Sequence, residues 1–336
     1  MSTHGIPGSL PVRQRVDWRK HLIPWLFLIG VLVVMPIFLP TFLQRMMGKF
    51  LIFAIFSISY NIVAGYAGLL SLGQAAYFGV GAYTVATMSY HFGISSMWIT
   101  GPAGILMGTL AAAVFGPIVL RVSGMYFLIL TFAIGQLFYS FVWNIPWFNV
   151  PGMQGIAGLP QPSIGIAGFR WTELSFYIFV LIVFAIAMWL QRRLSRSPFG
   201  HSLEGIREGE KRMLAMGYNV WLHKYLAFVI GGAFAALAGV LFVYQNRFVE
   251  PAHLNIMTSF LPMAMVIIGG PGTLWGPVVG AATIVFVEYY SSLLIPERWP
   301  LILGALFVLA IMFARKGLAV YAARGWRHVE ARLWKH

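Results

Sequence analysis

The sequence predicts an all-α fold, a polytopic bundle of about ten transmembrane helices with glycine-rich interrupted segments. Of its 336 residues, 59% are hydrophobic and only 10% are charged, and the mean hydropathy is +0.79. A soluble domain of this size needs more charge to cover its surface. Several apolar runs reach roughly 20 residues, enough to span a hydrocarbon core of about 30 Å. The alternating segments of about ten residues that a membrane β-barrel requires are absent.

The elements are expected in this order. Residues 1–21 are polar and basic and should form a cytoplasmic tail, and 317–336 should form a second, basic cytoplasmic tail. Between them, 22–316 should form the transmembrane domain. Its apolar runs lie at 22–39, 50–66, 72–92, 98–120, 124–143, 174–191, 223–245, 257–270, 274–294 and 299–315.

The net charge of +14 comes from basic residues that lie beside the apolar runs. Such an arrangement reports membrane topology, because loops rich in Lys and Arg stay cytoplasmic. It gives no reason to expect a nucleic-acid partner. With the N-terminus inside, Arg121, the loop 192–224 and the tail from Arg315 all fall on the cytoplasmic side. Arg45 and Lys49 break the rule, because the same alternation places them outside.

A glycine-rich segment separates the second and third runs. Glycine costs about 1 kcal/mol relative to alanine inside a helix, so the cluster marks a break or a close contact. Irregular backbone at membrane depth is tolerated where protein buries it or where it lines a watery cavity. We therefore expect this segment beside a solute path, with packing between helices as the alternative. If Ser71 begins a half-helix, its free N–H groups would meet a substrate carboxylate. The path residues expected here are Asn61, Gly65, Gly68, Ser71 and Gln74.

The spacing Gly65-x-x-Gly68-x-Leu70 recurs as Gly269-x-x-Gly272-x-Leu274. Glycine-interrupted segments in both halves of a transporter point to its substrate route. Six crossings separate these two, which implies a parallel repeat, with a chance match in a glycine-rich chain as the alternative. Gly272 is added to the path on this basis. Glu288, a carboxylate within an apolar run, is added because intramembrane charges mark functional sites by default; a paired or interfacial carboxylate is the alternative.

The loop 192–224 is the long hydrophilic segment between membrane runs. It predicts a short amphipathic helix that Ser202 caps and Gly217 ends. Mixed acidic and basic side chains favour docking of a cytoplasmic protein over a passive interfacial helix, which stays open. The apolar face is expected to hold Leu203, Ile206, Met213 and Leu214, and the charges around it are Arg207, Glu208 and Glu210.

The sequence contains no G-x-x-x-x-G-K-[ST] phosphate loop, no cysteine and no histidine–carboxylate cluster with metal spacing. We therefore expect no catalytic residue, no metal site and no cofactor in this chain. Ionisable groups within the membrane runs are also too few for a typical ion-coupled carrier. These observations favour an energy source outside the chain.

Three blocks carry a family resemblance. They read NIVAGYAGLLSLGQAAYFGVGAY at 61–83, SPFGHSLEGIREGE at 197–210 with continuations at 216–219 and 224–230, and MVIIGGPGTLWGPVVGA at 265–281. Together they resemble permease subunits of branched-chain amino acid ABC importers, of the second permease type. Members often carry histidine at the position of Gln74 and glutamine at that of Leu69, and their acidic-Ala-Ala portion reads Glu210-Lys211-Arg212 here.

The resemblance implies a permease domain over 22–316, with 192–224 as the coupling loop, in a bacterial inner membrane. It implies four kinds of partner: a paralogous permease subunit, two cytoplasmic ATPase subunits that hold ATP and Mg, a periplasmic solute-binding protein and membrane lipid. The expected cargo is a branched-chain amino acid or a related small polar solute. An ion-coupled secondary transporter or channel is the alternative.

Overall fold

The computed structural model describes residues 40–150, 154–165, 171–294, 299–313 and 317–318. The expected N-terminal tail, the first apolar run at 22–39 and residues 319–336 of the expected C-terminal tail lie outside the described residues. Each of the other apolar runs overlaps a helix, which confirms these elements, although the helix at the run 50–66 begins earlier, at Thr41.

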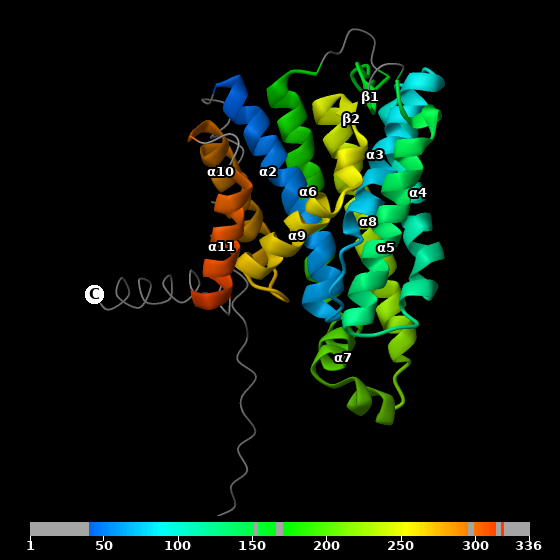
Figure 1. Ribbon diagram of the computed structural model, residues 1–336, viewed down its shortest axis with the longest axis vertical. Coiled ribbons are helices and arrows are strands. Elements are labelled where there is room, and N and C mark those ends of the chain that lie inside the picture. Colours follow the sequence, from blue (N-terminus) through cyan, green and yellow to red (C-terminus); the bar gives the residue numbers. More distant parts are fainter. Residues whose placement is uncertain (1–39, 151–153, 166–170, 295–298, 314–316, 319–336) are drawn as a thin grey trace, which may run out of the picture.

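Helices follow one another along almost the whole described chain (Figure 1). The long helix α2 runs on without a break into a π-helix, η2, and two short 3₁₀ turns, η3 and η4, follow α5 and precede α9. The bounds are α2 (Thr41–Tyr60), η2 (Asn61–Tyr66), α3 (Gln74–His91), α4 (Met97–Val119), α5 (Met125–Asn144), η3 (Pro146–Phe148), α6 (Glu173–Ser195), α7 (Pro198–Ala215), α8 (Val220–Asn246), η4 (Pro251–Leu254), α9 (Ile256–Gly269), α10 (Gly276–Leu294) and α11 (Trp299–Phe313).

Within the described residues, five helical segments are long and apolar enough to cross a membrane. The chain is thus a polytopic bundle of membrane helices, as predicted, while the total of ten crossings stays a prediction. The five segments are Thr41–Tyr66, Met97–Val119, Met125–Asn144, Glu173–Ser195 and Val220–Asn246.

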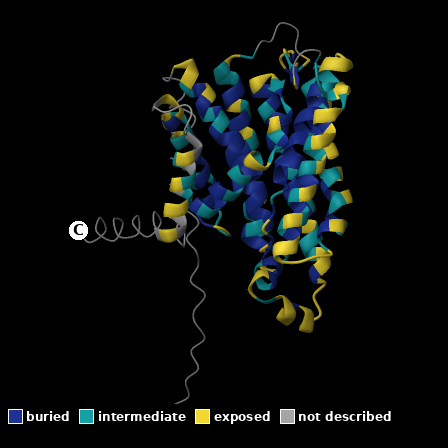
Figure 2. Ribbon diagram, in the orientation of Figure 1, coloured by how far each residue is buried: buried dark blue, intermediate teal, exposed yellow. Residues whose placement is uncertain are grey.

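The segment formed by α2 and η2 is the centre of the bundle. It packs against α6, α8 and α10, and α8 in turn packs against α3 and α4. In its most apolar window 89% of the residues are buried, against 28% in α4 and in α5. Figure 2 shows the outer faces of α4, α5 and α11 as exposed, with apolar side chains such as Leu106, Ile129 and Leu309. In a membrane these faces meet lipid or another subunit.

Small residues let the central helices approach closely. On α4, Gly108 lies against Ala236 of α8, and on α8, Gly239 lies against the carbonyl oxygen of Phe78 in α3. A Cβ on Gly239 would overlap that oxygen. Helices in lipid gain little from burying apolar side chains against each other, so close backbone contact of this kind stabilises their packing instead.

A two-stranded antiparallel ribbon, β1 (Ile156–Ala157) with β2 (Phe248–Val249), lies at the end of the bundle opposite α7 (Figure 1). The sequence prediction of helices alone missed it. Two residues per strand are too few to show an alternating pattern. The ribbon ties the loop before α6 to the end of α8.

Candidate functional site

The two glycine-rich segments meet in space. We define the first glycine segment as residues 65–73 and the second as residues 269–276. The buried side chain of Asn61, in η2, joins them: its Nδ2 donates to the Thr273 carbonyl oxygen (3.0 Å), and its Oδ1 accepts from the Gly272 backbone N–H (2.9 Å). Segments more than 200 residues apart in the chain are thus held by one amide. The internal repeat seen in the sequence corresponds to a contact between its two copies.

The contact needs glycine at particular positions. Gly68 and Gly272 have positive φ angles of 73° and 75°, a left-handed conformation that side chains disfavour. Gly65 is helical, but a Cβ there would overlap Asn61 Oδ1 and lie 2.6 Å from the Gly272 nitrogen. Its missing side chain leaves the room through which the Asn61 amide reaches the second segment. These glycines are required by close approach as well as by conformation.

Arg207 of α7 reaches both segments. Its Nη1 donates to the Gly65 carbonyl oxygen, and a Cβ would lie 2.7 Å from Arg207 Cγ if placed on Gly68, and 2.6 Å from Nη1 if placed on Gly272. The end of the π-helix frees that carbonyl, because the Leu69 N–H, its partner in a regular α-helix, bonds to the Val63 carbonyl oxygen instead. A cation at the C-terminal end of a helix also meets the negative end of the helix dipole. Arg207 therefore caps the central helix from a different element.

The helix α7 differs from its prediction at its start. Ser197, not Ser202, is the N-cap, and its Oγ accepts from the Gly200 N–H (3.2 Å). Pro198 at the first helical position fixes this earlier start. Ser202 lies inside the helix and donates to the Pro198 carbonyl oxygen (2.7 Å). The predicted end is confirmed, because Gly217 has a φ of 84° directly after α7.

The predicted apolar face of α7 is confirmed in three of four positions. Leu203, Ile206 and Met213 are buried, whereas Leu214 is 55% exposed. Gly209 takes an extended conformation and divides the helix into two parts, so the face does not continue at the helical spacing from 206 to 214. Ile206 and Met213 pack with Val220 in a small core of their own.

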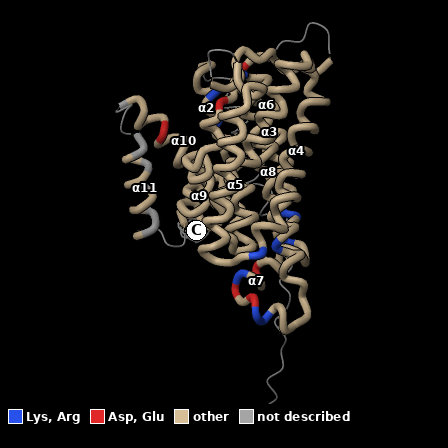
Figure 3. Tube along the Cα trace, turned by 45° about the vertical axis from the view of Figure 1, so that its right-hand side comes forward, with Lys and Arg blue, Asp and Glu red and all other residues tan. Residues whose placement is uncertain are grey.

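The charged residues of α7 mostly face away from the bundle. Figure 3 shows them as a group at one end of the molecule. Glu208 is exposed, and Glu210 pairs with Lys224 at the start of α8 (2.7 Å). This end therefore offers mixed charge to a partner, and Arg207, although exposed, also reaches the Gly65 carbonyl oxygen.

The start of α3 does not match the half-helix hypothesis. The helix begins at Gln74, three residues after Ser71. The backbone N–H groups around it are already bonded to hydroxyl oxygens: Leu72 to Thr131, Gly73 to Ser71 and Ala75 to Ser259. Free N–H groups for a substrate carboxylate are thus a wrong prediction at these three residues.

Gln74 itself is fully buried, and within the described part of the chain neither its Oε1 nor its Nε2 has a hydrogen-bond partner. Gln191 in α6 is also fully buried. A buried amide without partners costs free energy. Such groups are the ones expected to gain partners when a solute enters or the helices move.

Glu288 lies apart from the glycine segments. Its Oε1 accepts from Lys49 Nζ (2.9 Å), between α10 and α2. One turn earlier on α2, Arg45 pairs with Glu173 of α6 (2.5 Å). The structure thus divides the predicted path residues into a group around Asn61 and a charged group with Glu288. Arg45 and Lys49, the two exceptions to the positive-inside rule, thus each have an acidic partner.

Sequence reasoning missed the residues that complete the first group. Thr131 and Ser259 satisfy backbone N–H groups of the first segment and of α3, and Gln191 is a further buried polar residue, in α6. Each is a single polar residue within an apolar run, which was the available signal. Among the described residues, no group of three or more His, Asp or Glu side chains is placed to hold a metal ion.

A family profile described as "Branched-chain amino acid transport system / permease component" matches residues 42–313. This range covers most of the chain and includes every residue of the site described above. The chain belongs to this family. The permease is a transport subunit and not an enzyme, as the sequence predicted.

Among its relatives, the high-affinity branched-chain amino acid transport system permease protein LivM of Escherichia coli K12 is 29% identical over 290 residues. The alignment covers 80% of this chain and 68% of that protein. A probable LivM of Methanocaldococcus jannaschii is 28% identical, with 70% and 77% covered. LivH of Salmonella typhimurium is 22% identical, with 82% and 95% covered. No solved structure matches the chain.

Proposed function

We propose that this chain is the transmembrane permease subunit of an ATP-driven importer that moves branched-chain amino acids, or a related small polar solute, into the cytoplasm. Its membership of the permease family and its likeness to LivM proteins support this assignment. The contact between α7 and both glycine segments through Arg207 is the observation that carries the mechanism.

The proposal includes the partners. A paralogous permease subunit completes the pathway, and the likeness of this chain to both LivM and LivH supports such a pairing. Two cytoplasmic ATPase subunits hold ATP and Mg, and a periplasmic binding protein delivers the solute. The permease domain, 22–316, would cross a bacterial inner membrane about ten times, with both tails, 1–21 and 317–336, in the cytoplasm.

The distribution of charge supports the orientation. The end of the bundle with α7 carries most of the Lys and Arg residues of the described chain (Figure 3), including Arg121, Arg192 and Arg196. Cytoplasmic loops are rich in these residues. The ATPases would then contact α7, and the ribbon of β1 and β2 would face the binding protein.

In the mechanism, closure of the ATPase dimer moves α7. Because Arg207 holds the Gly65 carbonyl and lies against Gly272, this motion displaces both glycine segments together. The Asn61 amide keeps them aligned. The displaced segments open the bundle toward the cytoplasm, and the buried amide of Gln74 gains partners as the solute passes. Four residues around the first segment then line or support the path: Gly65, Gly68, Ser71 and Gln74.

The experiment replaces Arg207 with alanine and with lysine in the assembled complex. A hydrogen bond to a charged group is worth about 1.5–3 kcal/mol, so Arg207→Ala should lower ATP-driven uptake by at least about tenfold. Arg207→Lys keeps the charge but loses the planar fork of N–H donors, so its uptake should lie between that of the wild type and that of Arg207→Ala. The ATPase should still co-purify, since the exposed charges of α7 remain.

Arg193→Ala is the matched control. This exposed arginine at the end of α6 lies over the Trp189 ring and away from both segments. Equal uptake in the two alanine variants would refute the coupling role of Arg207. Uptake by the permease alone, driven by an ion gradient, would instead establish the secondary-transporter alternative.

A further inference from the structure

A cavity of about 230 Å³ lies between α2, α8 and α10, at the end of the bundle opposite α7. One water needs roughly 15 Å³ on this measure, so the space admits a small solute. Charged and apolar side chains share its lining: Arg45, Lys49 and Glu288 on one hand, and Phe42, Met46 and Val285 on the other. A mixed lining of this kind suits a ligand that is itself part charged and part aliphatic.

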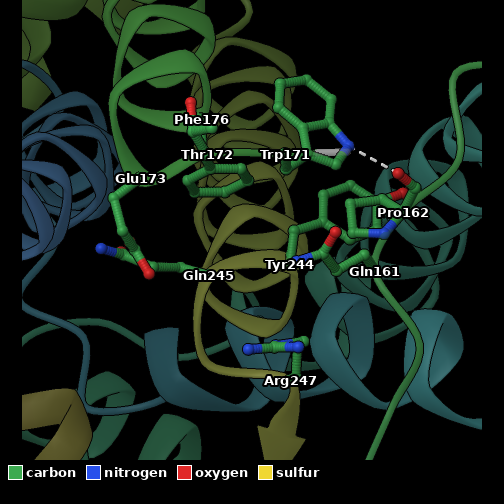
Figure 4. A pocket seen from close by; sticks show the side chains of 9 residues that line it. All are labelled: Gln161, Pro162, Trp171, Thr172, Glu173, Phe176, Tyr244, Gln245 and Arg247. Carbon is green, nitrogen blue, oxygen red and sulfur yellow. Dashed lines mark hydrogen bonds between the residues drawn. The ribbon is translucent and has the colours of Figure 1, made fainter. Parts of the chain in front are cut away.

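A second cavity beside it does not compete for this role. It measures about 30 Å³ and lies behind Glu173 and Gln245, where Trp171 Nε1 donates to the Pro162 carbonyl oxygen (Figure 4). That volume holds one or two waters. Gln245 separates the two spaces, and its Nε2 donates to the Arg45 carbonyl oxygen (2.7 Å). This hydrogen bond therefore holds the Gln245 side chain in place in the wall of the larger cavity.

The charges around the larger cavity are poorly explained by stability. Arg45 and Lys49 are four residues apart and share one face of α2. Their partners are Glu173 and Glu288, and each of the four side chains is at least 24% exposed. Partly exposed ion pairs contribute about 0–1 kcal/mol. Two cations on the outer side of a membrane protein also run against the usual distribution, so a function for them is required.

These ion pairs leave binding capacity unused. Arg45 engages Glu173 through Nη2, and a guanidinium has five N–H donors in a planar fork that matches a carboxylate. Glu288 engages Lys49 through Oε1, and its Oε2 has no bond to another described residue. A cationic donor and an anionic acceptor thus remain on facing helices, with the cavity between them.

We propose that this cavity receives a zwitterionic amino acid on its way into the permease. Arg45 and Lys49 hold the α-carboxylate, Glu288 holds the α-ammonium, and the aliphatic side chain lies against Phe42, Met46 and Val285. The inference rests on the proposed function, and it adds a reception site that selects for both charges of the solute. The group around Asn61 then serves the later, cytoplasmic part of the path.

The test compares Glu288→Gln, Lys49→Met and the double variant in the assembled complex, with Arg247→Gln as control. Arg247 is an exposed cation at the same end that does not line the larger cavity. Two readouts are ATP-driven uptake of L-leucine and ATP hydrolysis stimulated by the loaded binding protein. Both single variants and the double variant should lose uptake at least tenfold, while hydrolysis stays within twofold of the control.

The double variant separates a reception site from a structural ion pair. Removing both charges of a structural pair restores a neutral, packed site, so wild-type uptake in the double variant would overturn the proposal. The proposal would also be overturned if the wild-type complex took up urea, which is uncharged, but did not take up leucine, isoleucine or valine.

A third readout distinguishes failure of the reception site from failure of the proposed function. Saturation-transfer NMR reports contact of L-leucine with the complex of permease and ATPase subunits in nanodiscs, without the binding protein and without ATP. A signal in the wild type that is lost in Glu288→Gln supports the site even if ATP-driven uptake is absent. No signal in the wild type, or an equal signal in the variant, overturns the site whether or not ATP drives uptake.

Discussion

Replacing Asn61 with alanine removes the amide that joins the two glycine segments. The Gly272 N–H and the Thr273 carbonyl oxygen then lose their partner inside the bundle. Hydrogen bonds between membrane helices contribute about 0.6 kcal/mol on average and at most about 1.7 kcal/mol. Two of them give an expected loss of about 1–3 kcal/mol in the free energy of unfolding, measured by SDS titration of the purified permease in lipid micelles.

Aspartate at position 61 provides a sharper comparison. It keeps an oxygen for the Gly272 N–H but places a second oxygen against the Thr273 carbonyl, and it adds a buried charge without a partner. Asn61→Asp should therefore be less stable at neutral pH than Asn61→Ala. ATP-driven uptake should follow the same order, because the segments no longer move together.

The matched control for this series is Asn144→Ala. Asn144 is exposed, and its Nδ2 bonds within its own helix to Ser140. It should unfold within about 0.5 kcal/mol of the wild type. If Asn61→Ala unfolds at the same point as Asn144→Ala, or if Asn61→Asp is the more stable of the two variants at position 61, the reasoning from the buried amide is wrong.

Three further outcomes are expected. The Cβ of Gly239→Ala would overlap the Phe78 carbonyl oxygen, so this variant should lose about 1–3 kcal/mol in the free energy of unfolding. Gly304→Ala, whose Cβ would lie in open space, should keep the unfolding midpoint of the wild type. Gln74→Leu removes two buried amide atoms that have no partner among the described residues, so it should raise the unfolding midpoint yet slow uptake; a lower midpoint would contradict this. Burial lowers the pKa of His253, and Glu250 opposes this with a smaller effect. Below about pH 6.5 the unfolded chain therefore binds more protons than the folded chain, so the free energy of unfolding should fall on acidification. His253→Phe should flatten that dependence on pH.

The fold was largely accessible from the sequence because membrane helices carry a strong local signal. Run lengths near 20 residues and breaks at glycine or charge located most helices to within a few residues, but α2 begins at Thr41, nine residues before its predicted run. The start of α7 was missed because Ser197 and Ser202 both suit an N-cap, and the choice depended on Pro198. The ribbon of Ile156 and Val249 was missed because its pairing partners lie 93 residues apart.

The site was only partly accessible, for a different physical reason. Asn61, Gly65 and Gly272 were selected by composition and repetition, which report on local backbone. The contacts that unite them depend on how distant elements pack. Arg207 was assigned to the docking loop by its neighbours in sequence, and nothing local indicates that its side chain turns inward to Gly65. Glu288 was grouped with the others for its charge, although it lies at the opposite end of the bundle.

The cap that Arg207 provides has a consequence for biogenesis. Gly65 leaves the ribosome 142 residues before Arg207. At translation rates of roughly 5–20 residues per second, this delay is on the order of ten seconds. During that time the central helix is in the translocon or the bilayer with its last turn incomplete, and the second glycine segment follows later still. Chains arrested before residue 207 should therefore be preferred targets of membrane proteases, whereas chains arrested just beyond the second glycine segment should resist them.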